Sequence, residues 1–315
     1  MSAAVNGAHA PVMHDEVIAA LAIKPKGRYV DGTYGRGGHA RSILAALDED
    51  GHLIVMDRDP QAIADARVTF AADARVTIIH DDYANLKARI SELNLLQQVD
   101  GILLDLGVSS PQLDDAERGF SFQHNGPLDM RMNPQQGESA AAWLGRADEA
   151  EIARVLWEYG EERHSRRIAR KLVEVRQTQA LEDTATLASI ISALVPRPKN
   201  HKHPATRSFQ AIRIHINQEL AQIQLLLETV LDILKIGGRL LVISFHSLED
   251  RLVKRFIKAQ STQARIPRGL PVRDSEMHKV LRVAPPARAI KPGAAELAVN
   301  PRARSAILRI AERAA

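Results

Sequence analysis

Four short apolar segments of the sequence each end in acidic residues. Asp31 ends residues 29–31, Asp57 follows residues 52–56, and Asp105 follows residues 101–104. Asp81 and Asp82 follow residues 76–79 in the same way. Carboxylates at the ends of parallel strands point into the crevice where such sheets bind ligands, although an acid there can also cap the next helix. The spacing therefore predicts a ligand site for hydroxyl and cationic groups.

A glycine-rich turn at residues 32–38 follows the first of these segments. Glycines let the backbone approach a ligand closely, and the start of the following helix offers free N–H groups. The run from Gly35 to Ala40 fits the dinucleotide pattern G-x-G-x-x-[GA], so a nicotinamide enzyme is one interpretation. Asp31 favours S-adenosylmethionine instead, because a carboxylate there would repel a pyrophosphate but could accept from an ammonium group.

The elements that must position these residues alternate along the first hundred residues. Apolar segments 29–31, 52–56, 76–79 and 101–104 are separated by helical patterns, which indicates βαβ units and a parallel sheet buried on both faces. A fifth strand is expected at residues 239–244, after one helix over 213–236 that Gly237 and Gly238 close. Residues 280–283 and 306–310 are expected to form a final strand pair.

Residues 112–212 contain no pattern of a buried strand. Leu187, Ile190, Ile191 and Leu194 have helical spacing behind a cap at Asp183 or Thr184. We therefore expect an α/β core, residues 1–111 and 213–315, interrupted by a helical domain at 112–212 that recognises the substrate. The aromatic residues Phe120, Phe122, Trp143 and Trp157 are expected in the core or at the domain junction.

The charge of the chain is unevenly distributed. Residues 1–150 carry 13 Lys and Arg against 22 Asp and Glu, a net charge of −9. Because the whole chain carries +4, the remaining residues carry +13. Such asymmetry suggests a polyanionic partner, most simply nucleic acid, although a solvated basic surface is the alternative. The sequence contains no cysteine, no apolar run of membrane-spanning length and no secretory pattern, so we expect a cytoplasmic protein.

Long motifs of the chain resemble one family nearly from end to end: the bacterial 16S rRNA (cytosine-N4) methyltransferases known as the MraW (RsmH) family. The matching strings are HAPV at 9–12, YVDGT at 29–33, GRGGH at 35–39, DRDP at 57–60, DLGVSSPQLD at 105–114, RGFSF at 118–122, GPLDMRM at 126–132, HPATRSFQA at 203–211, SFHSLEDR at 244–251 and NPRARS at 300–305.

The resemblance implies a class I S-adenosylmethionine-dependent methyltransferase core with a helical insertion. It also implies that the enzyme methylates the N4 amine of a cytidine in the decoding region of small-subunit rRNA. The cofactor contacts that it implies are Gly37, Gly38, His39, Asp57, Tyr83, Asp105 and Gln112. Many relatives have Phe where this chain has Tyr83, which keeps a stacking face for the adenine.

Cytosine N4 is a poor nucleophile, so an enzyme must orient it and accept hydrogen bonds from its protons. Asp105 is a candidate acceptor, but the Pro-Pro that follows the acid in many amino-methyltransferases is Leu106-Gly107 here. His246, at the end of the fifth strand, is a candidate contact to the base. Ser247 and Asp250 have the spacing of a capping box.

A basic surface is the candidate RNA contact. Its residues are Arg166, Arg167, Arg170 and Lys171 on one helical face, with Lys202 and Arg207 in a second basic stretch. No cluster has metal-ligand spacing, so no metal is expected. The alternative to an enzyme is a non-catalytic RNA-binding assembly factor with a vestigial cofactor fold. The oligomeric state stays open.

Overall fold

The computed structural model describes residues 11–196, 203–261, 281–282 and 289–314. It divides into two compact units. Unit 1 comprises Met1–Gly107 and Leu220–Ala315, and unit 2 comprises Val108–Glu219. None of the helices in the described ranges is long and apolar enough to cross a membrane.

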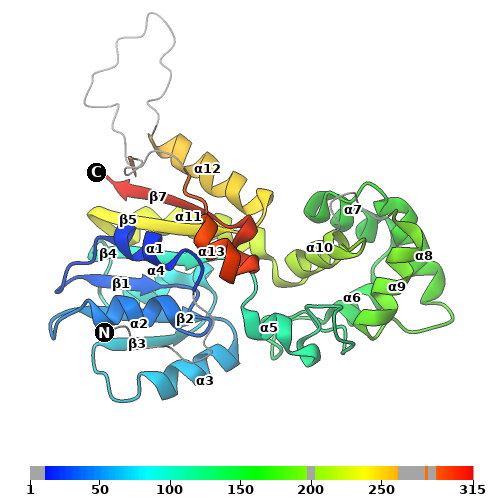
Figure 1. Ribbon diagram of the computed structural model, residues 1–315, viewed down its shortest axis with the longest axis horizontal. Helices are drawn as coiled ribbons and strands as arrows, with labels where there is room; N and C mark the ends of the chain where they lie inside the picture. The colour runs from blue at the N-terminus through cyan, green and yellow to red at the C-terminus, as the bar shows by residue number, and fades with distance from the viewer. Residues whose placement is uncertain (1–10, 197–202, 262–280, 283–288, 315) are drawn as a thin grey trace, which may run out of the picture. The chain divides into compact units, whose positions relative to one another are not determined.

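Unit 1 is built on a seven-stranded sheet of order β3-β2-β1-β4-β5-β7-β6 (Figure 1). Strands β1 to β5 are parallel, and β7 is antiparallel to both of its neighbours. The strands are β1 Arg28–Asp31, β2 His52–Asp57, β3 Val76–His80, β4 Val99–Asp105, β5 Leu234–Ser244, β6 Leu281–Arg282 and β7 Ile307–Arg313. The strand order reverses between β1 and β4, which is where doubly wound sheets bind ligands.

Helices cover both faces of this sheet, because alternate strand residues are buried on opposite sides. Leu53 and Leu103 belong to the cluster that packs against α1, α2 and α3. Ile54 and Ile102 belong to the cluster that packs against α4, α11 and α12. The helices of unit 1 are α1 His14–Leu21, α2 Gly38–Ala45, α3 Pro60–Thr69, η1 Tyr83–Asn85, α4 Leu86–Glu92, α11 Glu219–Ile233, α12 Ser247–Ser261, α13 Ala294–Val299 and η4 Pro301–Ser305.

Unit 2 is helical and has its own apolar core around Trp143, which is fully buried. Its helices are α5 Ser110–Asp114, η2 Ala116–Arg118, α6 Ala140–Arg146, α7 Glu149–Gly160, α8 Ser165–Val175, α9 Thr184–Leu194 and α10 Thr206–Asn217. Side chains of Asp148 and Asp183 cap the N-termini of α7 and α9 by accepting from Glu151 N and Thr186 N. Phe120 is buried as expected, whereas Trp157 is 58% exposed and is not a core residue.

The expected strands are confirmed, and the final pair forms between Leu281–Arg282 and β7. The single helix expected over 213–236 is wrong. Gln218 takes a left-handed conformation with φ 51° and separates α10 from α11. The closing turn at Gly237 lies instead inside the irregular start of β5, where a bulge shifts the register against β4.

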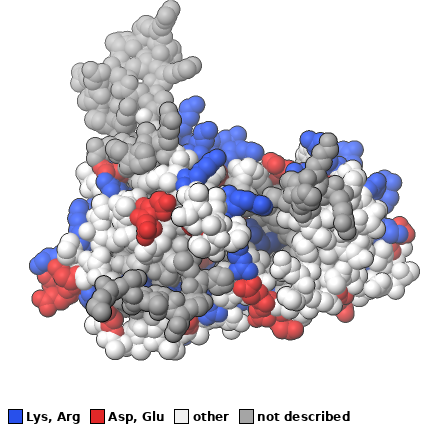
Figure 2. Space-filling view, in the orientation of Figure 1, with Lys and Arg blue, Asp and Glu red and all other residues white. Residues whose placement is uncertain are grey.

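Charged side chains are spread over the face shown in Figure 2. Lys and Arg gather on the part of unit 1 where Figure 1 places α12.

Candidate active site

The turn between β1 and α2 requires glycine at two of the predicted cofactor residues. Gly37 has φ +68°, and a Cβ atom there would lie 2.5 Å from the ring of Tyr34. A Cβ atom on Gly38 would lie 2.9 Å from Pro11. No side chain caps α2, so the N–H groups of its first turn are left for another acceptor. The turn therefore presents backbone donors with no side chain of its own in front of them.

Asp57, at the end of β2, holds this turn in place. Its Oδ2 accepts from Gly35 N at 2.8 Å, and its Oδ1 accepts from Asp59 N at 2.8 Å. Burial raises the pKa of Asp57 to about 6, against the effect of these backbone hydrogen bonds. The carboxylate thus has a structural role, and each oxygen keeps a second lone pair for a ligand hydroxyl.

Two further carboxylates lie at the neighbouring strand ends. Asp31 is 1% exposed and accepts from Thr33 N at 3.2 Å, and burial, together with the charge of Asp57, raises its pKa to about 7. The pKa of Asp105 is raised well above its ordinary value by burial first and then by Asp31, Glu249 and Glu296. Its Oδ1 is buried and has no hydrogen-bond partner among the described residues.

His39 faces Asp105 but does not neutralise it. Its Nε2 lies 3.1 Å from the carbonyl oxygen of Val12, which assigns the ring proton to Nε2. Its Nδ1 lies 4.0 Å from Asp105 Oδ2, and burial lowers the pKa of His39 to about 4. His39 is therefore neutral at physiological pH, and no ordinary cation balances the carboxylate.

The strand-end carboxylates thus form a site that lacks a positive charge. Within the described ranges, no Lys or Arg forms an ion pair with Asp31, Asp57 or Asp105. Burying ionised carboxylates without a partner is costly. A cationic ligand would remove that cost, so the donor set fits a group that carries ammonium and sulfonium charges.

The acids after β3 depart from the prediction that every strand-end acid faces the ligand. Asp81 Oδ2 pairs with Arg89 Nε at 2.7 Å, and Asp82 Oδ1 lies 2.8 Å from Arg58 Nε. These two carboxylates are neutralised by the chain itself. Tyr83 follows them, begins η1 and packs against the same cluster as Ile54.

Gln112, the remaining predicted cofactor residue, lies in unit 2 and is 5% exposed. Its Oε1 accepts from Ser109 N at 2.9 Å in a capping box at the start of α5. The structure therefore brings together Gly37, Gly38, His39, Asp57 and Asp105 within unit 1. It gives Gln112 a helix-capping contact in unit 2.

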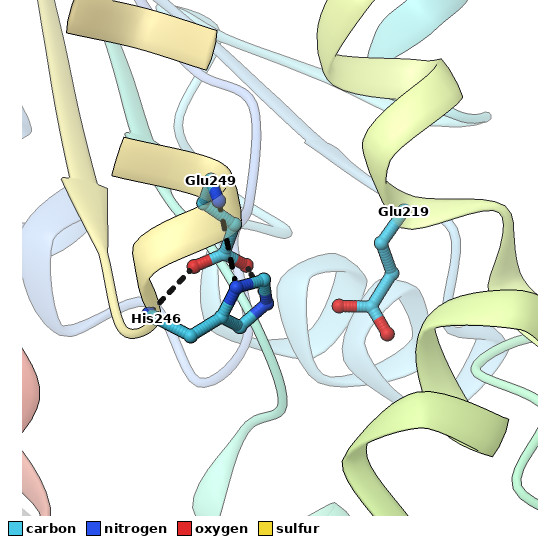
Figure 3. Close-up of side chains that lie close together, drawn as sticks. All are labelled: Glu219, His246 and Glu249. Carbon is cyan, nitrogen blue, oxygen red and sulfur yellow. Dashed lines mark hydrogen bonds and ion pairs between the residues drawn. The ribbon is translucent and has the colours of Figure 1, made fainter. Parts of the chain in front are cut away.

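His246 is held rigidly at the start of α12 by Glu249 (Figure 3). Glu249 Oε2 accepts from the backbone N–H groups of Phe245 and His246, and Glu249 N donates to His246 Nδ1 at 3.4 Å. His246 Nε2 lies 3.2 Å from Glu249 Oε1. Glu219, also drawn in Figure 3, belongs to unit 2 and pairs there with Arg213.

The capping box predicted at Ser247 and Asp250 is wrong by one residue. His246 and Glu249 form the reciprocal contacts of such a box. Asp250 instead makes a two-point ion pair with Arg309 of β7, with distances of 2.6 and 2.9 Å. The side chains of this turn are thus engaged in fixing α12 to the sheet.

Three residues of the site were missed by the sequence analysis. Thr33 Oγ1 accepts from Asp105 N at 2.6 Å and so positions the end of β4. Glu296 Oε1 accepts from Met13 N at 2.7 Å and adds to the negative field at Asp105. Only Glu249 had a local signal, the H-x-x-E spacing behind a strand.

The predicted RNA-contact residues lie in unit 2 where the structure describes them. Arg166, Arg167 and Arg170 of α8 are exposed. Arg170 lies 3.6 Å from Glu149, and Lys171 pairs with Glu174 at 2.7 Å. Arg207 donates to the carbonyl oxygen of Glu161 at 3.1 Å. Lys202 lies outside the described residues.

A sheet of this order, with a glycine turn after β1 and uncompensated carboxylates at β1, β2 and β4, defines an S-adenosylmethionine-dependent methyltransferase core. The model of the MraW methylase family matches residues 6–314. The chain belongs to that family.

Two curated relatives are similar over nearly their whole length. "Ribosomal RNA small subunit methyltransferase H" of Thioalkalivibrio sulfidiphilus is 55% identical over 316 residues, covering 100% of both chains. The protein of the same name from Idiomarina loihiensis is 55% identical over 305 residues, covering 97% of this chain and 96% of the relative.

Solved structures are similar at a lower level. An rRNA methylase from Streptococcus thermophilus matches with a TM-score of 0.43 and 12% identity, covering 98% of this chain and 100% of that one. A structure named as an rRNA methylase from Clostridium thermocellum matches with a TM-score of 0.43 and 13% identity, covering 95% and 94%. Nothing about the activity of this chain follows from similarity at that level.

Proposed function

We propose that this protein transfers the methyl group of S-adenosylmethionine to the exocyclic N4 amine of a cytidine in the decoding region of 16S rRNA. Membership of the MraW methylase family and the name of the two relatives support an rRNA of the small subunit as the substrate. The observation that carries the chemistry is the buried Asp105 Oδ1, which has no hydrogen-bond partner in the described part of the chain.

The cofactor, when bound, supplies an electrophilic methyl group on a positively charged sulfur. Gly37 and Gly38 offer backbone approach at the start of α2, and Asp57 offers acceptors for ribose hydroxyls. Asp31 and Asp105 supply the negative charge that a cationic ligand needs. Each of these roles uses a group whose position the surrounding chain already fixes.

Asp105 accepts a hydrogen bond from the target amine. An amine bound to carbon gains a positive charge when it attacks, and it must lose a proton to leave the neutral product. A carboxylate with a raised pKa is a better proton acceptor than an ordinary one. Thr33 holds the backbone of Asp105 so that its side chain stays directed into the site.

The composition of the chain favours an amine over the other positions of a pyrimidine nucleotide. Methylation of C5 normally needs a cysteine that attacks C6, and the sequence has none. Methylation of a ribose hydroxyl usually needs a lysine-type base, and residues 105–114 contain no lysine. An exocyclic amine needs only orientation and an acceptor.

The product tests the proposal directly. We expect N4-methylcytidine when the protein is incubated with labelled cofactor and small subunits from cells that lack this methylation. Digestion of the RNA to nucleosides followed by mass spectrometry identifies the methylated species. Recovery of 5-methylcytidine or 2′-O-methylcytidine as the product, or of no methylated nucleoside at all, would contradict the proposal.

Cofactor affinity should increase with pH. The pKa of Asp31, about 7, and that of Asp57, about 6, leave both partly protonated in the ligand-free protein at mildly acidic pH. A cationic ligand favours the ionised forms, so binding should release protons. Between pH 5.5 and 7.5 we expect an affinity gain of up to about tenfold per pH unit for each carboxylate still protonated.

Calorimetric titrations in two buffers of different ionisation enthalpy would count the released protons. The range stops at pH 7.5 because an α-amino group, such as that of the cofactor, titrates at about 8. The stability of the ligand-free protein should change in the opposite direction. A raised carboxylate pKa stabilises the fold at low pH, and this contribution is lost as pH rises through about 7. A constant affinity over this range would refute the assignment, and the Asp31→Asn variant should show a weaker pH dependence.

The basic face of α8 is proposed to bind RNA phosphates. Changing Arg166, Arg167 and Arg170 to Glu should weaken RNA binding and flatten its dependence on salt by about 0.7–0.9 per lost contact. Filter binding over a range of salt concentrations would measure both quantities. Cofactor affinity should not change. Wild-type RNA affinity and salt dependence in this variant would show that the face is only solvated.

A further inference from the structure

Helix α12 carries four basic side chains on one face. Arg251, Lys254, Arg255 and Lys258 are spaced i, i+3, i+4 and i+7, and all four are exposed. Residues at this spacing share one side of a helix. We call these four residues the α12 stripe.

The α12 stripe points away from the core because the opposite face of the helix is fixed. Val253 and Ile257 are buried in the cluster that covers one face of the sheet, and Leu252 and Phe256 pack against it. The ion pair between Asp250 and Arg309 ties the start of the helix to β7. The stripe is therefore a fixed array of charges on a rigid element.

The α12 stripe has a cost that other helices of this protein avoid. Lys and Arg elsewhere face acids one turn away: Arg89 with Glu92 in α4, Arg154 with Glu158 in α7, and Lys171 with Glu174 in α8. In α12, Arg251 faces Arg255 and Lys254 faces Lys258 at i, i+4, and each such like-charge pair costs about 0.2–0.5 kcal/mol.

No acid of the helix relieves this repulsion. Residues 251–261 contain no Asp or Glu, and Glu249 and Asp250 are engaged with the turn before the helix and with Arg309. In the described part of the chain, no acid forms an ion pair with Lys254, Arg255 or Lys258. A uniform charge that weakens its own helix calls for a partner that supplies negative charge.

We propose that the α12 stripe binds backbone phosphates of the RNA substrate. The inference rests on the proposed function and extends it, because it places an RNA contact on unit 1, the unit that also holds the carboxylate site. From Arg251 to Lys258 the stripe spans about 10 Å along the helix, so it can meet more than one phosphate. A membrane surface would need exposed apolar residues, and the apolar side of α12 is packed against the sheet.

The experiment measures binding of a decoding-region transcript of 16S rRNA to full-length protein over a range of KCl concentrations. The test variant is K254E/R255E/K258E. The matched control is K26E/R67E/K87E, which changes the net charge equally at solvent-facing positions of other parts of unit 1. A neutral variant, K254Q/R255Q/K258Q, keeps the test valid if charge reversal disturbs folding. Cofactor affinity of every variant checks that the carboxylate site is intact.

We expect the α12 variant to bind RNA about tenfold more weakly or worse near 0.1 M salt, with a salt slope smaller by about two to three. The control should keep the wild-type slope and affinity within about twofold. Equal losses in both variants would mean that only net charge matters, and no loss in either would mean that the α12 stripe is only solvated.

Wild-type binding to the transcript, combined with weaker binding to assembled small subunits, would assign the α12 stripe to a protein partner and so refute the RNA contact. The proposed function fails separately, through the absence of N4-methylcytidine with the wild-type enzyme.

Discussion

Replacing Asp105 by Asn should slow methyl transfer about 100-fold or more at saturating cofactor and RNA. The substitution keeps the shape of the side chain but removes its negative charge and its capacity to take a proton. Loss of a positioned proton acceptor typically costs a factor of about 10²–10⁴ in rate. Asp105 should show an effect of that size because its Oδ1 has no other partner among the described residues and its pKa is raised.

Single-turnover rates with labelled cofactor, together with the cofactor dissociation constant from calorimetry, separate the two roles of Asp105. If it accepts the amine proton, the rate constant falls far more than the affinity. The Asp232→Asn variant is the control, because that carboxylate pairs with Lys87 at the surface. A wild-type rate at saturating cofactor would leave Asp105 as a cofactor ligand only.

Replacing Asn217 by Ala should destabilise unit 2 by about 3–5 kcal/mol. Asn217 is 2% exposed and makes three hydrogen bonds. Its Oδ1 accepts from Met132 N at 2.7 Å, and its Nδ2 donates to the carbonyl oxygens of Met130 and Arg213 at 2.7 and 2.9 Å. Alanine would leave these buried backbone groups without their partner, which is more costly than losing an exposed hydrogen bond.

Tryptophan fluorescence reports this effect for unit 2 alone, because both tryptophans of the chain, Trp143 and Trp157, lie in it. Urea titrations followed by fluorescence should show a lower midpoint for Asn217→Ala, and Gln177→Ala, at an exposed site, should match the wild type. A change of less than about 1 kcal/mol would show that the three hydrogen bonds are replaced when Asn217 is lost.

The parts of the fold that follow from local patterns were predictable. Strands such as Leu53 to Met56 and Ile102 to Leu104 are apolar throughout because helices cover both faces of the sheet. The glycine turn was predictable because Gly37 has a positive φ and no room for a side chain. These features depend on the residues within one or two elements.

The parts that were missed depend on contacts between distant residues. The helical pattern runs without interruption through Gln218, and the break there is accompanied by the contacts of Asn217 to Met130 and Met132, more than 80 residues away in sequence. Glu296 reaches the field of Asp105 from the far end of the chain. His246 is not a common N-cap residue, so the S-x-x-D spacing beside it was the more persuasive pattern.

The insertion of unit 2 between β4 and β5 affects the order in which the site is completed during synthesis. The carboxylates of β1, β2 and β4 leave the ribosome early, but β4 can pair with β5 only after all of unit 2 has been made. Closing so long a loop is slow unless the intervening segment folds first and shortens it.

Glu249, and then Glu296 with its hydrogen bond to Met13 across 283 positions, arrive last. The nascent chain therefore acquires its full negative field around Asp105 only when its two ends meet, which couples competence to bind a cation to the completion of translation.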